Sequence, residues 1–287
     1  MPASRAFFVF MNRTIFAALL LAAARAQAAD DPAPPNRNFG IFTGDPEAYS
    51  IVSVADGLSE HKATYLLPFS YSRDFADHRN EVVFQISAKL QLLNSDFYAA
   101  YTQKSFWLLY NQKQSAPFRE TDYNPEIFYR WTPDPDRFHH WGADFGFEHE
   151  SNGQTLPQSR SWNRLYIAPF QARGKQLAHF KFWYRIPENA KTSPNDARGD
   201  DNPDIQRFYG YAEFRFQREF GELNQHAALM VRGNPATGRS AVELTFSLPY
   251  EKRGMFYCLY LWHGYGESLI DYNHQVTRAG IGIMLAR

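Results

Sequence analysis

Residues 141–153 read Trp-Gly-Ala-Asp-Phe-Gly-Phe-Glu-His-Glu-Ser-Asn-Gly. In a β-strand, successive side chains point to opposite faces. As a strand, this stretch has one apolar face that ends in His149 and Ser151, and a second face of glycines and acidic residues. In a soluble protein the apolar face would be the core. If it instead faces lipid, His149 and Ser151 lie where the acyl chains of a membrane pack.

Alternation of the same kind recurs along the chain from about residue 63. The clearest example is 81–93, where every second residue is apolar. Segments 178–185, 208–217 and 242–248 repeat it, with charged or polar residues on the second face. A period of two over about ten residues predicts β-strands. A soluble β-sandwich would also alternate, so this pattern alone does not distinguish the two architectures.

The number of such segments and the lengths of their connections favour a membrane barrel. Twelve segments can be counted, and an even number permits a closed up-and-down barrel. Connections after odd-numbered segments are longer than those after even-numbered ones, as in outer-membrane barrels. We therefore expect an all-β fold, a twelve-stranded antiparallel transmembrane β-barrel. The expected strands are 63–72, 81–94, 97–111, 124–133, 139–151, 161–172, 177–186, 205–219, 226–233, 239–250, 255–264 and 277–286.

The composition excludes several classes of protein. The formal net charge is +0 at pH 7, which argues against nucleic acid as a partner because phosphate binding needs an excess of basic residues. Beyond the N-terminus, no apolar run reaches the ~18 residues of a spanning helix. This excludes a helical membrane protein but not a barrel. Cys258 is the only cysteine, so an internal disulfide is impossible.

The N-terminus has the features of an export signal. Two arginines precede or flank a short apolar stretch, which ends in the small-x-small sequence Ala26-Gln-Ala28. Translation could start at Met1 or at Met11, since the pattern restarts there. The expected organisation is a signal peptide over 1–28, a lead-in segment over 29–62 and the barrel over 63–287.

Three polar residues are expected to meet on the apolar face. His149 and Ser151 end one expected strand, and Asn163 begins the next. Neighbouring antiparallel strands lie ~5 Å apart, so all three can converge at the end with the long connections. A serine, a histidine and a group that orients the histidine are what nucleophilic acyl transfer requires. Polar groups on a lipid-facing wall cost free energy unless they bond to one another.

The residues around this set resemble the active-site signature of the bacterial outer membrane phospholipase A family. The likeness runs in matching order from about Tyr101 to the end of the chain. The stretches that carry it are His149-Glu-Ser-Asn-Gly153, Ser159-Arg-Ser-Trp-Asn-Arg164, Ser115-Ala-Pro-Phe-Arg-Glu-Thr121, Asp200-Asp-Asn-Pro-Asp-Ile205 and Gly264-Tyr-Gly-Glu-Ser-Leu-Ile-Asp-Tyr-Asn273.

The resemblance implies an exported enzyme of the bacterial outer membrane. Members of the family are twelve-stranded barrels that hydrolyse the acyl esters of membrane phospholipids, with A1, A2 and lysophospholipase activity. By resemblance, Ser151 is the nucleophile, His149 is the general base and Asn163 orients the histidine, on the outer wall of the barrel. A neutral asparagine fixes the imidazole but stabilises the imidazolium less than a carboxylate does.

The family also uses calcium and works as a homodimer, so the resemblance implies a Ca²⁺ cofactor and a second copy of the chain. Ser115 of the partner subunit, Gln154 and Ser159 would surround the catalytic ion. Asp201 would serve a second calcium position, and the backbone amide of Gly153 would join the oxyanion hole. Gln154 stands where the family has an arginine, which matters only if the side chain binds the ion. Dimerisation would complete the site and switch the enzyme on.

Two alternatives remain at this stage. A non-catalytic outer-membrane barrel, either a porin or a structural protein, explains the alternation and the connection lengths equally well. It gives no reason for His149, Ser151 and Asn163 to share the apolar face. A secreted soluble hydrolase with a β-sandwich fold would stay in solution without detergent.

The resemblance to the family also extends to Gln103, which matches a glutamine that the family buries in its dimer interface.

Overall fold

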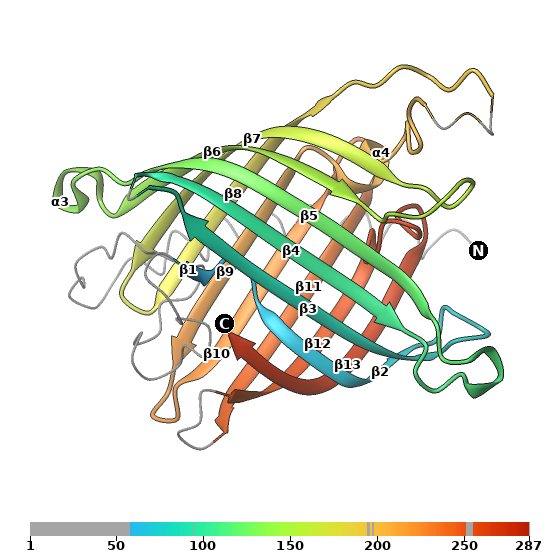
Figure 1. Ribbon diagram of the computed structural model, residues 1–287. Coiled ribbons are helices and arrows are strands. Elements are labelled where there is room, and N and C mark those ends of the chain that lie inside the picture. Colours follow the sequence, from blue (N-terminus) through green and yellow to red (C-terminus); the bar gives the residue numbers. More distant parts are fainter. Residues whose placement is uncertain (1–57, 94, 194–195, 197, 251–254, 287) are drawn as a thin grey trace, which may run out of the picture.

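The computed structural model describes residues 58–93, 95–193, 196, 198–250 and 255–286. Most of them form antiparallel strands of a single sheet that closes on itself (Figure 1). The expected signal peptide and most of the lead-in segment lie outside the described residues, and both stay predictions. Among the described residues, no helix has the length and apolar character needed to cross a membrane.

The barrel wall consists of strands β2 to β13, each paired with its neighbours in sequence, and β13 pairs with β2. A short additional strand, β1, pairs with the end of β3. The strands are β1 (Leu58–Glu60), β2 (Thr64–Ser72), β3 (Asn80–Gln91), β4 (Phe97–Trp107), β5 (Phe118–Trp131), β6 (Trp141–Ser151), β7 (Ser161–Arg173), β8 (Gln176–Ile186), β9 (Ala212–Phe220), β10 (Gln225–Asn234), β11 (Arg239–Tyr250), β12 (Met255–Tyr265) and β13 (Gln275–Ala286).

The expected twelve-stranded barrel is confirmed, with three departures in its strands. β4 ends at Trp107 and not at 111. β5 begins at Phe118 and not at 124, because a register shift opposite Trp107 interrupts the alternation there. The expected strand 205–219 is wrong in its first part, which forms the short helix α4 (Gln206–Tyr209). Gly210 then has a φ of 72°, and a Cβ there would lie 1.8 Å from the carbonyl oxygen of Gly233. That close backbone approach allows only glycine.

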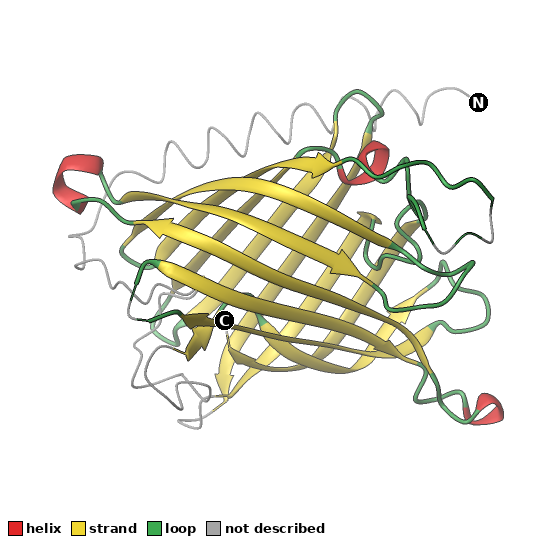
Figure 2. Ribbon diagram, turned by 45° about the horizontal axis from the view of Figure 1, so that its top comes forward, coloured by secondary structure: helices red, strands yellow, loops and turns green. Residues whose placement is uncertain are grey.

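The connections separate the two ends of the barrel. Figure 2 shows the short helix α3 (Pro135–Phe138) at one end, and η1 (Gln112–Gln114) with α4 at the other. The second end carries the connections 73–79, 108–117, 152–160, 187–211, 235–238 and 266–274. The longest of all, 187–211, lies at this end, as expected. The connection 132–140, which contains α3, is longer than the sequence predicted for the opposite end.

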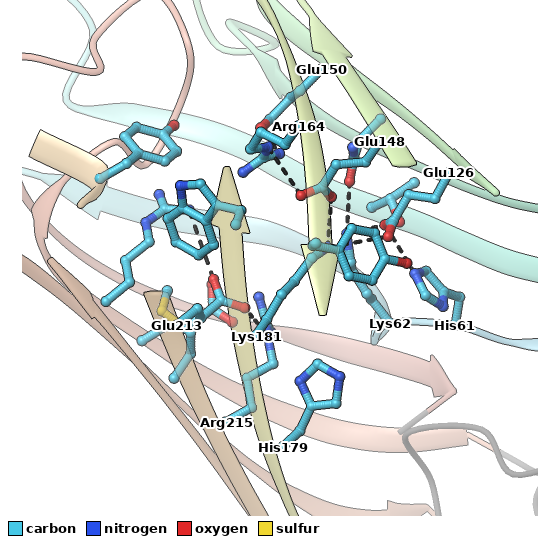
Figure 3. A pocket seen from close by; sticks show the side chains of 18 of the residues that line it. His61, Lys62, Glu126, Glu148, Glu150, Arg164, His179, Lys181, Glu213 and Arg215 are labelled. Carbon is cyan, nitrogen blue, oxygen red and sulfur yellow. Dashed lines mark hydrogen bonds and ion pairs between the residues drawn. The ribbon is translucent and has the colours of Figure 1, made fainter. Parts of the chain in front are cut away.

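The inside of the barrel holds paired charges (Figure 3). Glu126 forms ion pairs with Lys62 at 2.8 Å and with Lys181 at 3.2 Å. Lys181 also pairs with Glu148 at 2.6 Å, and Glu148 pairs with Arg164 at 3.0 Å. Buried charges cost free energy unless each finds a partner of opposite sign. This chain of pairs links β5, β6, β7 and β8 to the segment that precedes β2.

The outer face of the barrel is apolar. Its exposed side chains include Phe145 (46%), Ile167 (43%), Leu244 (39%) and Ile281 (57%). A soluble protein has the reverse arrangement, with apolar residues inside and charges outside. Alternation of outward apolar and inward polar residues is the pattern of a barrel whose wall contacts lipid. The closed single sheet also excludes the β-sandwich alternative.

The apolar wall predicts a depth-dependent cost for an outward charge. Leu244 lies near the middle of β11 and pairs with Leu229 and Leu261. Leu244→Arg should lower the free energy of unfolding in lipid vesicles by ~2–4 kcal/mol, because the guanidinium would enter the hydrocarbon. Urea titration of the vesicle-inserted protein measures this change.

Leu223→Arg is the matched control. Leu223 is 68% exposed in the connection 221–224, beyond the ends of β9 and β10. A charge at that position should change the free energy of unfolding by less than ~1 kcal/mol. Equal costs for the two variants would show that the wall around Leu244 does not face hydrocarbon.

Candidate active site

His149 and Asn163 are direct cross-strand partners in the β6–β7 pair. The imidazole Nδ1 and the amide Oδ1 of Asn163 lie 2.9 Å apart and form a hydrogen bond. Because the amide oxygen can only accept, Nδ1 carries the hydrogen and Nε2 is left as the acceptor. A histidine in this tautomer can take a proton through Nε2.

Ser151 follows His149 by two residues at the end of β6 and therefore lies on the same face. Phe147, two residues earlier on this face, is 37% exposed, and Leu165 beside Asn163 is 51% exposed. The residues between them, such as Glu148, point inward and belong to the paired charges of the lumen. The structure thus places all three predicted catalytic residues on the outer face, at the end with the longest connection, and joins His149 to Asn163 by a hydrogen bond.

Gly153 comes two residues after Ser151 and has a φ of 62°. This left-handed conformation favours glycine, and a Cβ at this position would lie 3.2 Å from the ring of Tyr123. Tyr123 is also the cross-strand partner of Ser151 on β5. The turn at Gly153 therefore fixes the backbone amides that follow the serine, which is what a backbone oxyanion hole needs.

Asn152 has a structural role that the sequence analysis missed. Its side chain is buried and points inward, where Nδ2 donates to Glu120 at 3.0 Å and to the carbonyl of Gln158 at 2.8 Å. Its Oδ1 accepts from the backbone amides of Gln154 at 3.3 Å and Arg160 at 2.9 Å. One amide thus holds both ends of the connection 152–160. The turn-forming sequence Ser-Asn-Gly was the available signal, since asparagine often bonds to nearby backbone.

Two of the predicted calcium residues meet at this end of the barrel. The Ser159 hydroxyl donates to Asp201 Oδ2 at 2.5 Å, which joins the connections 152–160 and 187–211. Lys191 forms an ion pair with the other oxygen of Asp201. Gln154 lies in the same connection as Ser159. Ser115, on the connection 108–117, makes no hydrogen bond to them within the described part of the chain.

The donor set suits a hard cation that is held by hydroxyl and carbonyl oxygens. No cluster of three or more His, Cys, Asp or Glu residues suited to a metal ion occurs among the described residues. Ser159 and the backbone of Gln154 supply oxygens of the right kind, so the residues fit calcium on that side. The Asp201 carboxylate is already neutralised by Lys191, so a cation there would compete with the ammonium group.

The connection 187–211 is fixed to its neighbours by partly buried polar contacts. The Tyr272 hydroxyl, on the connection 266–274, donates to Asp204 at 2.5 Å. Burial, together with this hydrogen bond, raises the pKa of Tyr272. The phenol therefore remains a neutral donor at physiological pH. The backbone amide of Ser161, at the start of β7, donates to the Asn202 side chain at 3.0 Å.

Comparison with known proteins supports an acyl hydrolase. Residues 52–285 match the family model of Phospholipase A1. Phospholipase A1 of Escherichia coli strain K12 is 39% identical over 227 residues, covering 75% of this chain and 73% of that protein. Phospholipase A1 of Salmonella typhimurium is 40% identical over 218 residues, covering 72% and 70%.

Solved structures agree. Outer membrane phospholipase A from Escherichia coli superimposes with a TM-score of 0.70 at 34% identity, over 79% of this chain and 98% of that chain. A Salmonella typhi outer membrane phospholipase, described as a dimer with bound calcium, gives a TM-score of 0.70 at 34% identity, over 81% and 93%. An active-site mutant of the Escherichia coli protein, with an asparagine replaced by alanine, gives 0.70 at 33% identity, also over 81% and 93%. With the match over 52–285 and the shared barrel, this chain belongs to the phospholipase A1 family and is an enzyme of the bacterial outer membrane.

Proposed function

We propose that this phospholipase hydrolyses the acyl esters of membrane phospholipids, with A1, A2 and lysophospholipase activity, through Ser151, His149 and Asn163. The observation that carries the proposal is the 2.9 Å hydrogen bond between His149 and Asn163 on the lipid-facing wall. A polar pair in that position costs free energy and calls for a functional reason. The active-site mutant of the Escherichia coli relative, in which an asparagine is replaced, supports the role given to Asn163.

The reaction follows from the positions of these three side chains. A phospholipid lies with its acyl chains along the apolar wall and its ester beside Ser151. As the Ser151 hydroxyl attacks the ester carbonyl, Nε2 of His149 takes its proton, and the Gly153 amide donates to the developing oxyanion. The imidazolium then gives the proton to the departing lysophospholipid oxygen. A water molecule, activated by the same histidine, releases the fatty acid from the serine.

We further propose that the reaction depends on calcium. When bound, the ion would supply a positive charge that polarises the ester carbonyl and the attacking water. The Ser159 hydroxyl and the main-chain carbonyl of Gln154 would hold it in this subunit, with Ser115 of the partner subunit completing the site. Asp201 would serve a second position. The calcium-bound dimer of the Salmonella typhi relative supports this arrangement.

A polar cluster on the outer wall supports a homodimer. The Tyr101 hydroxyl donates to Gln103 at 3.0 Å, and the Gln103 amide donates to Ser105 at 3.1 Å. Thr121 of β5 also donates to Ser105, at 3.1 Å. Ser105 is fully buried, but Tyr101 is 42% exposed and Gln103 is partly exposed. Such polar side chains on a lipid-facing wall favour association, because a partner can offer hydrogen bonds that lipid cannot. Pairing through β4 and β5 would bring the Ser115 connection of one subunit towards the partner's site.

The charged and polar side chains that cross the lumen argue against the porin alternative. Beside the ion pairs around Lys181, the Lys104 ammonium on β4 donates to the Tyr260 hydroxyl on β12 at 3.0 Å. Such contacts cross the interior from one wall to the other. Porins keep a water-filled channel open there.

Replacing the nucleophile tests the proposal directly. Ser151→Ala should lower the rate of fatty-acid release from phospholipid–detergent micelles by at least about a thousandfold. Ser161→Ala is the matched control, because Ser161 is the β7 partner of Ser151 and has no part in the mechanism. It should retain the parent rate. Equal rates for Ser151→Ala and the parent protein would refute the catalytic assignment.

Mixing two defective variants tests whether Ser115 acts across the dimer. Ser115→Ala at limiting calcium and Ser151→Ala should each be impaired alone. In a mixed dimer, the subunit that retains Ser151 would receive an intact Ser115 from its partner. With random pairing of equal amounts, half of the dimers are mixed, and one site in each mixed dimer holds both Ser151 and an intact Ser115 from the partner. About a quarter of all sites would therefore be complete. No gain on mixing, in samples where cross-linking shows mixed dimers, would place Ser115 outside the partner's site. Calcium chelation should abolish activity in every sample.

A further inference from the structure

The connection 187–211, described except for 194–195 and 197, covers the start of β7 beside the active site. It contacts every second residue from Ser159 to Asn163. Asp201 accepts from Ser159, and Asn202 accepts from the backbone of Ser161. At the third position, Glu188 Oε1 accepts from the Asn163 amide nitrogen at 3.4 Å. This last contact joins a charged residue to the proposed catalytic set.

Glu188 reaches Asn163 because of strand register. Asn163 pairs with Ile186, the last residue of β8, and Glu188 follows two positions later on the same side. Its side chain is partly buried. We infer that Glu188 is a positioning residue of the active site, which acts on His149 through the Asn163 amide. The inference rests on the proposed function.

The carboxylate determines which end of the amide faces the histidine. An asparagine side chain has a donor end and an acceptor end of nearly equal shape. A carboxylate can only accept, so it attracts the NH₂ end and leaves Oδ1 facing His149. In the reversed orientation the NH₂ group would face Nδ1 and place the imidazole hydrogen on Nε2. That tautomer could not take the proton of Ser151.

The carboxylate also supplies a charge that asparagine lacks. A neutral amide stabilises an imidazolium less than a carboxylate does. Glu188 places a negative charge directly behind the amide, on the outer side of the wall, where nearby lipid weakens screening. It therefore stabilises the imidazolium that forms as Ser151 attacks. In this inference Ser151, His149, Asn163 and Glu188 act on one another in that order.

The other ionisable groups near Asn163 and Glu188 lie on neighbouring strands and connections. The groups that face it from neighbouring elements are Tyr123 of β5, Tyr184 of β8 and, one connection away, Asp201 with its partner Lys191. The charged residues of β6 and β7 next to the pair, Glu148, Glu150 and Arg164, point into the lumen and bond to one another. Glu188 is thus the carboxylate in contact with Asn163 on the outer face.

Glu188→Gln tests the charge. It should lower kcat by about tenfold to a hundredfold, by analogy with the loss of a hydrogen-bonded partner that orients a metal-binding histidine, with little change in KM. The acid limb of the pH profile of kcat/KM should move to lower pH, because the imidazolium loses a stabilising charge and a more acidic solution is needed to protonate the base. Asp196→Asn, which removes a carboxylate from the same connection, should change neither quantity.

A double substitution gives the sharpest test. Asn163→Asp places a second carboxylate against Glu188, so the two like charges repel and the variant should be impaired. Adding Glu188→Gln to it should then raise kcat, because glutamine can donate to the new aspartate. Glu188→Gln would thus be harmful in the parent and beneficial in Asn163→Asp. A loop that merely holds the fold together would give the same sign in both backgrounds.

The outcomes separate this inference from the proposed function. All variants are compared as folded barrels, checked by their electrophoretic mobility without heating. If Ser151→Ala is inactive but Glu188→Gln keeps the parent kcat and pH profile, the role of Glu188 is wrong and the catalytic set stands. If the sign of the Glu188→Gln effect does not reverse in Asn163→Asp, the contact does not act through the amide. If Ser151→Ala is active, the proposed function itself fails.

Discussion

The hydrogen bond between His149 and Asn163 depends on a constraint that governs the whole wall: adjacent residues of a strand face opposite media. Each even-numbered residue of β6 near the site faces the charged interior, and each odd-numbered one faces lipid. A slip of one residue would exchange the two sets and place Glu148 in hydrocarbon. The ion pairs of Glu148 with Arg164 and Lys181 therefore hold the register that keeps the imidazole on the outside.

The interior supports the site in a second way. Asn152 faces inward from the residue after Ser151 and bonds to Glu120, which also accepts from the backbone amide of Ile270 at 3.0 Å. The serine is thus flanked by a β-strand on one side and by a buried polar anchor on the other. As the proposed nucleophile, Ser151 is thus held by rigid elements and needs no loop to close over it. In the proposed dimer, the second subunit would add ion-binding oxygens and would not need to rearrange Ser151.

Much of this could be predicted from the sequence because period two is a strong local signal. The twelve strands, the parity of His149, Ser151 and Asn163, and the end of the barrel at which they lie all follow from alternation and connection length. The start of β9 was missed because Phe208 and Gly210 continue the alternation, although α4 and the backbone contact at Gly210 interrupt the strand. The β5 start was missed because a register shift hides the period.

The roles of Asn152 and Glu188 could not be predicted because both depend on contacts between distant connections. Nothing in the sequence near Glu188 indicates that its carboxylate reaches Asn163, 25 residues away in the chain. Likewise, Lys191 pairs with Asp201 within the connection 187–211, whose sequence has no periodic pattern that would predict the contact. Periodic patterns in the sequence predict the strands of the wall, whereas the contacts between connections become visible only in the three-dimensional structure.

The paired charges that cross the lumen have a physiological consequence. Lys62, Glu126, Lys181 and Glu148 tie the inner walls together, and Lys104 reaches Tyr260 on the opposite side. These contacts narrow the interior, so the described part of the barrel does not offer small solutes the wide channel of a porin.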